Sequence, residues 1–416
     1  MTPLSILGAK LNGERVDVLV DNGRIKEIRP AGIGLSVGRI IDAKGGLLTA
    51  PYADPHVHLD AVLLAQVCPN ESGTLKEGIA NWASMREQMT EADLLERATS
   101  AVKWCVAHGT GRIRTHVDCR SPMAVEALCA FREEIEHLVE LQVVAFPQEG
   151  IFNASRQKSD LVWAVEHGVD AVGAIPHHEA TPERGRESIS LAFDLAEKHG
   201  IQIDLHCDET DDPESQHILW VCHEKIQRGF QNHVLAGHCT AMHSYSESVA
   251  EKAIQAVVES RVQVVANPLD NIVLQGRGDG YPRRRGITRI PELLSAGALV
   301  GVGHDSIMDP WYPLGRGNLV DAVSMLVHVA QMTRPKEIER SHQLMVDDNH
   351  AGFGGPPVLE EGGEASFLIH SVSDASTIVR TRAVPRWVLR RGAVVAETVP
   401  SESVVLDERL RLGLLD

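Results

Sequence analysis

Apolar runs of strand length recur through the middle of this chain and alternate with longer amphipathic segments. Continuous apolar runs of this kind are typical of strands that are buried on both faces of a parallel sheet. There are eight of them: GLLTAPYADPHVHLD (46–60), GRIRTHVD (111–118), LQVVAFPQEG (141–150), AVGAIPHHE (171–179), IQIDLHCDET (201–210), HVLAGHCTAM (233–242), VQVVANPLDN (262–271) and ALVGVGHDS (298–306).

The longer segments between the runs predict helices. TEADLLERATSAVKWCVAHG (90–109) and SISLAFDLAEKHG (188–200) have helical character, and each ends near a glycine that can cap a helix. Strands that alternate with helices form βα units and a parallel sheet. Eight such units are the number in a closed (β/α)8 barrel of the TIM type, and we predict that fold for the middle of the chain.

Both ends of the chain carry a different pattern, in which apolar residues alternate around short turns. VDVLVDNGRIKEI contains Asn22-Gly23, and RWVLRRGAVVAE contains Arg391-Gly392, which predicts a β-hairpin at each end. Because chain termini often lie close together, we expect the two ends to pair into one small β-sandwich domain. The predicted division is sandwich for residues 1–50, barrel for 51–356 and sandwich again for 357–416.

The composition narrows the choice of partner and compartment. The 416 residues include 40 basic and 57 acidic side chains, a net charge of −17, so the general surface is expected to repel nucleic acid and anionic membranes. No apolar run approaches the roughly 18 residues of a membrane span, and no signal peptide is visible. The seven cysteines form no C-x-x-C pair, which suits free thiols in a reducing compartment. We predict a cytoplasmic protein that binds a small molecule.

Polar or titratable residues end each of the eight runs. The carboxyl ends of the strands form the active-site face of a (β/α)8 barrel, so these side chains are expected around one mouth. The residues that this argument brings together are His56, His58, His116, Gln148, His177, His206, Glu209, His238, Asn267 and Asp305.

Four of these residues predict a metal site. His56 and His58 are two positions apart on one strand, so both imidazoles point to the same side. His206 ends the fifth run and Asp305 the eighth, which gives three imidazoles and one carboxylate. That set suits one divalent ion with a water in an open position, and both iron(II) and zinc(II) fit it.

Two further residues are candidates for proton transfer. Glu209 follows His206 by three residues and can reach a bound water or the substrate without binding the metal, as a proton shuttle requires. Alternatively it belongs to a solvated acidic loop, since DETDDPE carries further charges. His238 ends the sixth run and can orient the water or pass protons.

Other features limit the kind of site. We expect structural roles for His116, His177 and His178. The fourth run ends without a lysine, so a second metal bridged by a carbamylated lysine is not expected. The sequence also lacks the H-x-E…P-C-x-x-C signature that holds zinc in one group of nucleobase-modifying enzymes.

Sequence blocks longer than a metal site requires occur in order from about residue 50 to about residue 320. They are PHVHLD, SGTLKEGI, RTHVD, VAFPQEGI, VGAIPHHE, HCDE, TAMHSY, ANPL-NI-LQGR, YPRRRGITR, GHD and DPWYPLG. Together these blocks resemble the cytosine deaminase family of the amidohydrolase superfamily, and the β segments at the two ends fit its small sandwich domain.

The resemblance implies roles for the matched residues. The implied ligands of one Fe(II) or Zn(II) ion are His56, His58, His206 and Asp305. Glu209 would move a proton to the ring nitrogen, while His238 and Asp305 would activate the metal-bound water. Gln148 would hydrogen-bond the carbonyl edge of a pyrimidine, between apolar walls formed by Leu75 and Trp311. The family also favours a homo-oligomer.

One position departs from the family pattern. The residue after the ligand aspartate is a second aspartate in the well-known cytosine deaminases, whereas here it is Ser306. The position is expected to lie near C5 of the pyrimidine and its amine. A serine leaves room for a methyl group, worth up to about 0.8 kcal/mol when buried. An aspartate would crowd that methyl group and leave its own carboxylate poorly solvated.

We therefore predict that the protein deaminates 5-methylcytosine to thymine and cytosine to uracil, through attack of metal-bound hydroxide on the amine-bearing carbon. The alternatives are that cytosine is preferred and Ser306 is a tolerated difference, that the substrate is another cyclic amidine such as isoguanine or creatinine, or that a cyclic amide is hydrolysed. A catalytically inactive binding protein on the same fold is a further alternative. It would be expected to have lost a ligand or the shuttle, and this chain has all of them.

Overall fold

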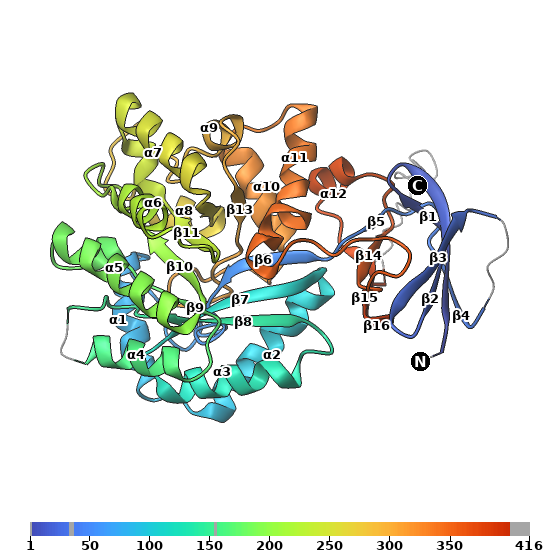
Figure 1. The fold of residues 1–416 in the computed structure, drawn as a ribbon, viewed down its shortest axis with the longest axis horizontal. Coiled ribbons are helices and arrows are strands. Elements are labelled where there is room, and N and C mark those ends of the chain that lie inside the picture. Colours follow the sequence, from blue (N-terminus) through green and yellow to red (C-terminus); the bar gives the residue numbers. More distant parts are fainter. Residues whose placement is uncertain (1, 33–36, 154–155, 400–416) are drawn as a thin grey trace, which may run out of the picture.

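The computed structural model describes residues 2–32, 37–153 and 156–399. Its main body is a sheet of eight parallel strands in chain order, curled toward a barrel and surrounded by helices (Figure 1). The strands are β6 (Tyr52–Val57), β7 (Thr110–Asp118), β8 (Glu140–Phe146), β9 (Ala171–Val172), β10 (Gln202–Cys207), β11 (Val234–His238), β12 (Gln263–Ala266) and β13 (Val300–Val302). Each strand coincides with one of the eight apolar runs, and the predicted barrel fold is confirmed.

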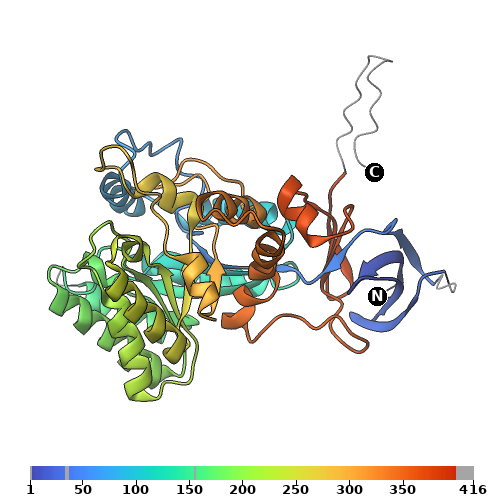
Figure 2. The ribbon, with the colours of Figure 1, turned by 90° about the horizontal axis from the view of Figure 1, so that it is seen from above.

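The helices lie around this sheet (Figures 1 and 2). Helix α2 begins after Thr90, whose hydroxyl accepts from the backbone N–H of Asp93 at 3.3 Å, and α5 ends at Gly200, where φ is 69°. The helices are α1 (Leu75–Arg86), α2 (Glu91–Ala107), α3 (Pro122–Glu134), α4 (Gln157–Glu166), α5 (Pro182–His199), α6 (His217–Arg228), α7 (Glu247–Ser260), α8 (Pro268–Leu274), α9 (Ile290–Ser295), α10 (Leu319–Val329), α11 (Pro335–Val346) and α12 (Ala375–Thr381), with the short 3-10 helices η1 (Pro176–His178), η2 (Thr240–Ser244) and η3 (Asp348–Phe353).

The barrel closes where β6 meets β13. On the carboxyl side of this seam, the backbone N–H of Asp305 donates to the carbonyl of His56 at 2.8 Å. On the amino side, the Asn349 side chain of η3 lies between the strands. Its amide nitrogen donates to the carbonyls of Ala53 and Val302 at 2.7 Å, and its oxygen accepts from the N–H of Val302 at 2.9 Å. Asn349 thus joins the first and last strands of the barrel.

The two chain ends form a small two-sheet domain beside the barrel (Figure 2). Apolar residues of both sheets, among them Ile6, Val18, Phe367 and Leu389, share one buried core. The first sheet has the order β3-β2-β1-β4, with β1 (Leu4–Leu11), β2 (Glu14–Asp21), β3 (Arg24–Pro30) and β4 (Arg39–Asp42); the second has the order β16-β15-β14-β5, with β5 (Leu48–Thr49), β14 (Phe367–His370), β15 (Pro385–Arg390) and β16 (Ala393–Glu397). The predicted sandwich built from both ends is therefore confirmed.

Both predicted hairpin turns are present. Asn22 and Gly23, between β2 and β3, have φ values of 50° and 78°, while Arg391 and Gly392, between β15 and β16, have values of 46° and 79°. Two successive residues with positive φ are the mark of the turn whose twist matches a hairpin. Glycine at the second position adopts this conformation at little steric cost.

The limits of the three predicted segments, after residues 50 and 356, stay a proposal, and residues 400–416 of the last segment lie outside the described residues. Within the described ranges, no helix is both long enough and apolar enough to cross a membrane. The seven cysteines lie in the described part of the chain and are free thiols.

Candidate active site

The carboxyl ends of the barrel strands surround a cavity. Its lining consists of His58, Leu75, Gln148, His206, Glu209, His238, Asp270, Leu274, Asp305, Ser306 and Trp311. All of these residues except Asp270 and Leu274 belong to the predicted site. His56, the remaining predicted residue, is fully buried beside them.

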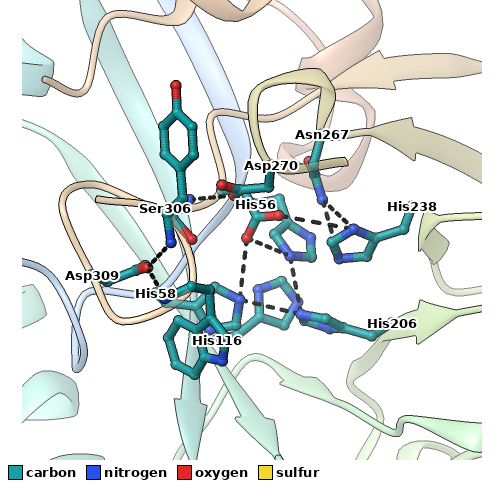
Figure 3. A network of polar contacts seen from close by, with 12 residues as sticks. His56, His58, His116, His206, His238, Asn267, Asp270, Ser306 and Asp309 are labelled. Carbon is teal, nitrogen blue, oxygen red and sulfur yellow. Dashed lines mark hydrogen bonds and ion pairs between the residues drawn. The ribbon is translucent and has the colours of Figure 1, made fainter. Parts of the chain in front are cut away.

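Three imidazoles and one carboxylate converge at the inner end of this cavity (Figure 3). The Nε2 atom of His206 lies 3.2 Å from the Nε2 atoms of both His56 and His58. Oδ1 of Asp305 lies 3.6 Å from Nε2 of His56 and 3.4 Å from Nε2 of His58. Four ligand atoms around one tetrahedral ion are about 3.3–3.4 Å apart when the metal bonds are about 2.0–2.1 Å long. The side chains therefore stand at the separations that a shared divalent ion requires.

The protonation of the histidines fits the same conclusion. Burial, followed by the neighbouring histidines, lowers the pKa of His56 and of His206 well below the usual value. Burial also lowers the pKa of His58 to about 4. The three rings are neutral at pH 7, and a neutral imidazole offers a lone pair to a metal. The donor set present in the structure thus suits a divalent metal ion.

Two other histidines stand close enough to join a metal cluster. His56 forms one possible triad with His206 and His238, and another with His58 and His116, with ligand atoms within 4.8 Å of one another. The Nε2 atom of His116 is engaged by Asp204 at 3.0 Å, however. His238 faces Glu209, with 3.4 Å between its Nδ1 and Oε1 of the carboxyl.

The backbone at His238 and Asp305 is left-handed, with φ of 66° at each residue. Non-glycine residues adopt this conformation at a cost of about 1–3 kcal/mol, and such strain gathers at functional sites. At both residues, the turn follows directly from the carboxyl end of a strand. It directs an acid or base toward the cavity.

Glu209 is buried at the cavity wall and is not part of a solvated loop. Burial, with a smaller contribution from Asp270, raises the pKa of its carboxyl to about 8. The group therefore carries a proton at neutral pH and can act as an acid. Its backbone N–H points to Nδ1 of His177 at 3.4 Å, a contact that gives His177 a structural role.

Two asparagines that the sequence argument assigned no role hold the ring of His238. Nδ2 of Asn271 lies 3.0 Å from Nδ1 of the ring, and Nδ2 of Asn267 lies 3.3 Å from Nε2. Burial lowers the pKa of His238 well below its usual value, so the ring is neutral. Asn267 was among the residues expected at the mouth, whereas Asn271 follows one helical turn later.

The wall opposite the metal cluster combines an amide with apolar side chains. Gln148 follows β8, in a loop whose N–H groups at Ile151 and Phe152 donate to the buried carboxyl of Glu179 at 2.5 and 3.1 Å. The ring of Trp311 lies 5.5 Å from that of His58. Leu75, the first residue of α1, completes this wall. The arrangement suits a flat, partly polar ring.

Ser306 is buried and lines the cavity beside two carboxyls. Its backbone N–H donates to Oδ2 of Asp270 at 3.0 Å, and the carboxyl of Asp309 also faces it. Burial and the neighbouring Asp305 raise the pKa of Asp270 well above the usual value. Sequence reasoning missed Asp270, although an acid near the end of the seventh apolar run, in ANPLDN, was an available signal.

His116 and His178 stay out of the cavity lining. His116 shares Asp204 with Arg114, a fully buried arginine 3.0 Å from that carboxyl, and Arg114 donates in turn to the carbonyl of Gly352 at 3.0 Å. These contacts link η3, through Arg114 and Asp204, to His116 inside the barrel.

A (β/α)8 barrel with clustered imidazoles and carboxyls at its mouth defines a class of metal-assisted hydrolase. Residues 72–396 match the Amidohydrolase family, and the chain belongs to this family. It is accordingly a hydrolase that acts on C–N bonds. The family resemblance predicted from the motifs is confirmed.

Relatives of known name differ in their substrates. The crystal structure of 5-methylcytosine deaminase from Klebsiella pneumoniae, liganded with 5-fluorocytosine, is 33% identical and has a TM-score of 0.91, with 97% of this chain and 99% of that chain covered. Pterin deaminase from Rhizobium rhizogenes is 28% identical over 93% of this chain and 89% of its own length. N-isopropylammelide isopropyl amidohydrolase from a Pseudomonas species (strain ADP) is 25% identical over 84% and 83%.

Proposed function

We propose that this protein is a metal-dependent deaminase of free pyrimidine bases, which converts 5-methylcytosine to thymine and cytosine to uracil with release of ammonia. The observation that carries the proposal is the 33% identity, over 97% of the chain, to a 5-methylcytosine deaminase. The small buried side chain of Ser306 at the cavity wall supports it, because it leaves space beside the ring.

One divalent ion, Fe(II) or Zn(II), would be held by His56, His58, His206 and Asp305. When bound there, such an ion lowers the pKa of a coordinated water to about 7, which supplies a nucleophile at neutral pH. The neutral state of the three imidazoles and the separations of the four ligand atoms support this assignment.

The residues of the chain carry the proton transfers. Glu209 is protonated at neutral pH and would donate to the ring nitrogen next to the amine-bearing carbon. His238 is neutral, and the amides of Asn267 and Asn271 hold its ring; it would take a proton from the attacking water. The departing amine leaves as ammonia, so one water is consumed for each base converted.

The opposite wall would orient the base. The amide of Gln148 both donates and accepts, which suits the carbonyl edge of a pyrimidine with its adjacent ring nitrogen. Leu75 and Trp311 would enclose the ring.

A pterin is the second candidate substrate, on the strength of the 28% identity to pterin deaminase over 93% of the chain. Its amine-bearing carbon lies between two ring nitrogens, and its pyrimidine is fused to a second ring. The higher identity, 33%, to the 5-methylcytosine deaminase favours the pyrimidine over this bicyclic base.

The test is ammonia release from metal-replete protein, preceded by metal analysis. The panel contains cytosine, 5-methylcytosine, 5-fluorocytosine, pterin, isoguanine, creatinine and a cyclic amide. We expect one ion per chain and release from the three pyrimidines. Turnover of other compounds alone would overturn the substrate assignment, and carefully handled protein without metal would indicate an inactive binding protein. The expected homo-oligomer stays a prediction, for sedimentation velocity to test.

A further inference from the structure

Asp208 is a buried carboxyl directly before Glu209, and the proposed reaction does not use it. It follows the last residue of β10, is fully buried, and lies outside the cavity lining. Its φ is 50°, in the left-handed region, which aspartate adopts more readily than most residues. The chain turns at Asp208, and the next residue, Glu209, lines the cavity.

The carboxylate of Asp208 caps helix α6, which begins nine residues later. Oδ1 accepts from the backbone N–H of His217 at 3.1 Å, and Oδ2 accepts from that of Ile218 at 2.8 Å. Gln216, directly before the helix, makes no capping hydrogen bond with its side chain. Asp208 therefore satisfies two of the donors that the first turn of a helix leaves free, and its negative charge suits that end of the helix.

Side chains at the end of the loop bind the same carboxylate. Oγ of Ser215 donates to Oδ1 at 2.7 Å, and Nδ1 of His217 lies 2.9 Å from this oxygen. Residues 209–216 thus form a loop between the strand end and the helix, and one buried side chain holds its base together.

The peptide that joins Asp208 to Glu209 is fixed as well. The carbonyl of Asp208 accepts from the backbone N–H of Ala241 at 3.0 Å and from the hydroxyl of Thr240 at 3.2 Å, both in η2. The backbone N–H of Glu209 has a longer contact, 3.4 Å to Nδ1 of His177. Glu209 is therefore held mainly through the residue before it.

We propose that Asp208 is a positioning residue, which holds Glu209 where its carboxyl can reach the ring nitrogen of the base. The assignment rests on the proposed role of Glu209 as the acid. A general acid must lie within hydrogen-bond reach of the atom that it protonates, and a displacement of about 1 Å can lower the rate about 10²-fold. Asp208 acts on the reaction through Glu209 and does not touch the substrate.

Asp208→Asn keeps the shape of the side chain but removes one acceptor. Whichever way the amide turns, its NH2 group faces one of the two helix N–H groups, so either His217 or Ile218 loses its hydrogen bond. On metal-replete protein, we expect kcat for 5-methylcytosine to fall about tenfold to 10²-fold, because Glu209 acts in the chemical step. KM should change less than about threefold, and bound metal should stay at the wild-type level.

The combination with Glu209→Gln separates positioning from a general loss of structure. Residues that act as one unit have effects that do not add. Once Glu209→Gln has removed the acid, Asp208→Asn should change kcat by less than about twofold. The same fall in kcat in both backgrounds, or a wild-type kcat in Asp208→Asn, would overturn the positioning role.

Asp17→Asn is the matched control. Asp17 is buried in the small two-sheet domain, and each of its oxygens also accepts one backbone N–H, from Gly8 at 2.7 Å and from Gly32 at 3.0 Å. Its variant should lose stability as Asp208→Asn does, yet keep the wild-type kcat at a temperature where it is folded.

Ser215→Ala is the milder variant that decides the question if Asp208→Asn does not fold. It removes one donor and leaves the carboxylate in place. It should lower kcat by a smaller factor than Asp208→Asn, and only when Glu209 is present. A wild-type kcat in Ser215→Ala would then overturn the role.

A crystal structure of Asp208→Asn gives a result that does not depend on the substrate. The carboxyl of Glu209 should lie farther from His238 than the 3.4 Å of the wild type, and an unchanged position would overturn the proposal. If wild-type protein converts none of the bases in the panel, the proposed function is wrong, whereas the position of Glu209 in this structure still tests Asp208.

Discussion

Glu209 and Ser306 are the residues whose surroundings say most about the chemistry of the site. One is a carboxyl that burial keeps protonated at neutral pH, and the other is a small side chain between two carboxyls at the cavity wall. A single substitution tests each role: an amide of the same shape at Glu209, and a larger acidic side chain at Ser306.

Glu209→Gln should lower kcat by about 10²- to 10⁴-fold, because the amide cannot donate and recover an acidic proton. Bound metal should stay at the wild-type level, since Glu209 is not among the proposed ligands. Glu214→Gln, the same change at an exposed position of the same acidic loop, is the control and should behave as wild type. Normal turnover in Glu209→Gln would remove the proposed shuttle.

Ser306→Asp should shift the preference from 5-methylcytosine toward cytosine, by at least about fourfold, the value of one buried methyl group. The reason is steric and electrostatic, since the new carboxylate would occupy the free space next to Asp270 and Asp309. The measurement is the ratio of kcat/KM for the two bases. As a control, Ser306→Ala leaves the space beside the base open and should keep the wild-type ratio of kcat/KM. An unchanged ratio in Ser306→Asp would show that the size of this side chain does not set the preference between the two bases.

Residue types and strand ends were enough to predict most of the site. His56, His58, His206 and Asp305 come together because each follows or ends a barrel strand, a position that the apolar runs reveal. The acid in ANPLDN shows only that Asp270 is near a strand end; its neighbour in space is Ser306, 36 residues away, and no local pattern encodes that contact.

At the scale of elements, the segment η3 closes the barrel. Its Asn349 makes three hydrogen bonds across the seam between β6 and β13, and its Gly352 carbonyl receives the buried Arg114. The seam also positions the site, since His56 follows Ala53 on β6 and Asp305 lies three residues after Val302, the end of β13. Loosening it is expected to weaken the whole barrel.

Asn349→Asp should lower the free energy of unfolding by about 2–5 kcal/mol, because two buried carbonyls lose their donor. Equilibrium unfolding in urea at pH 7 measures the effect. Asn153→Asp is the matched control: Asn153 also donates to two carbonyls, those of Glu149 and His178, but its side chain is exposed. Its variant should stay within about 0.5 kcal/mol of wild type. Equal losses in the two variants would contradict the closing role.

The hairpins and the barrel strands are specified by residues close together in the sequence, whereas the position of η3 is specified by contacts with distant residues. Asn22-Gly23 and Arg391-Gly392 specify their turns locally, and the parallel strands are recognisable because they are apolar throughout. The contacts of Asn349 with Ala53 span 296 positions of the chain and leave no periodic signal. The two-residue length of β9 is likewise set by its neighbours β8 and β10.

The stability of the whole molecule should depend on pH through buried histidines such as His350. Burial, and then the guanidinium of Arg112, lowers the pKa of His350 to about 4, while its Nε2 contacts the carbonyl of Pro51 at 2.9 Å. Arg112 is paired with Glu140 at 3.0 Å. In the unfolded chain, this histidine takes up a proton near pH 6.5. The contribution of neutral, buried His350 to the free energy of unfolding is therefore complete above pH 6.5 and is lost as the pH falls toward 4.

The free energy of unfolding of His350→Gln should therefore depend less on pH than that of the wild type. Between pH 6.5 and 4, its slope should be smaller by about 1.4 kcal/mol per pH unit. Urea unfolding at several pH values in this window measures the difference, with exposed His137→Gln as the control that follows wild type. Parallel curves for wild type and His350→Gln would show that this histidine does not contribute to the acid sensitivity.

For the whole molecule, we propose that the barrel mouth binds one metal ion and a pyrimidine with room for a methyl group at C5. The most direct measurement is kcat/KM for 5-methylcytosine and for cytosine, side by side, on one metal-replete preparation. We predict turnover of both bases with a ratio that favours the methylated one. A ratio strongly in favour of cytosine would make Ser306 a spectator, and no turnover of either base by metal-loaded protein would contradict the proposed function.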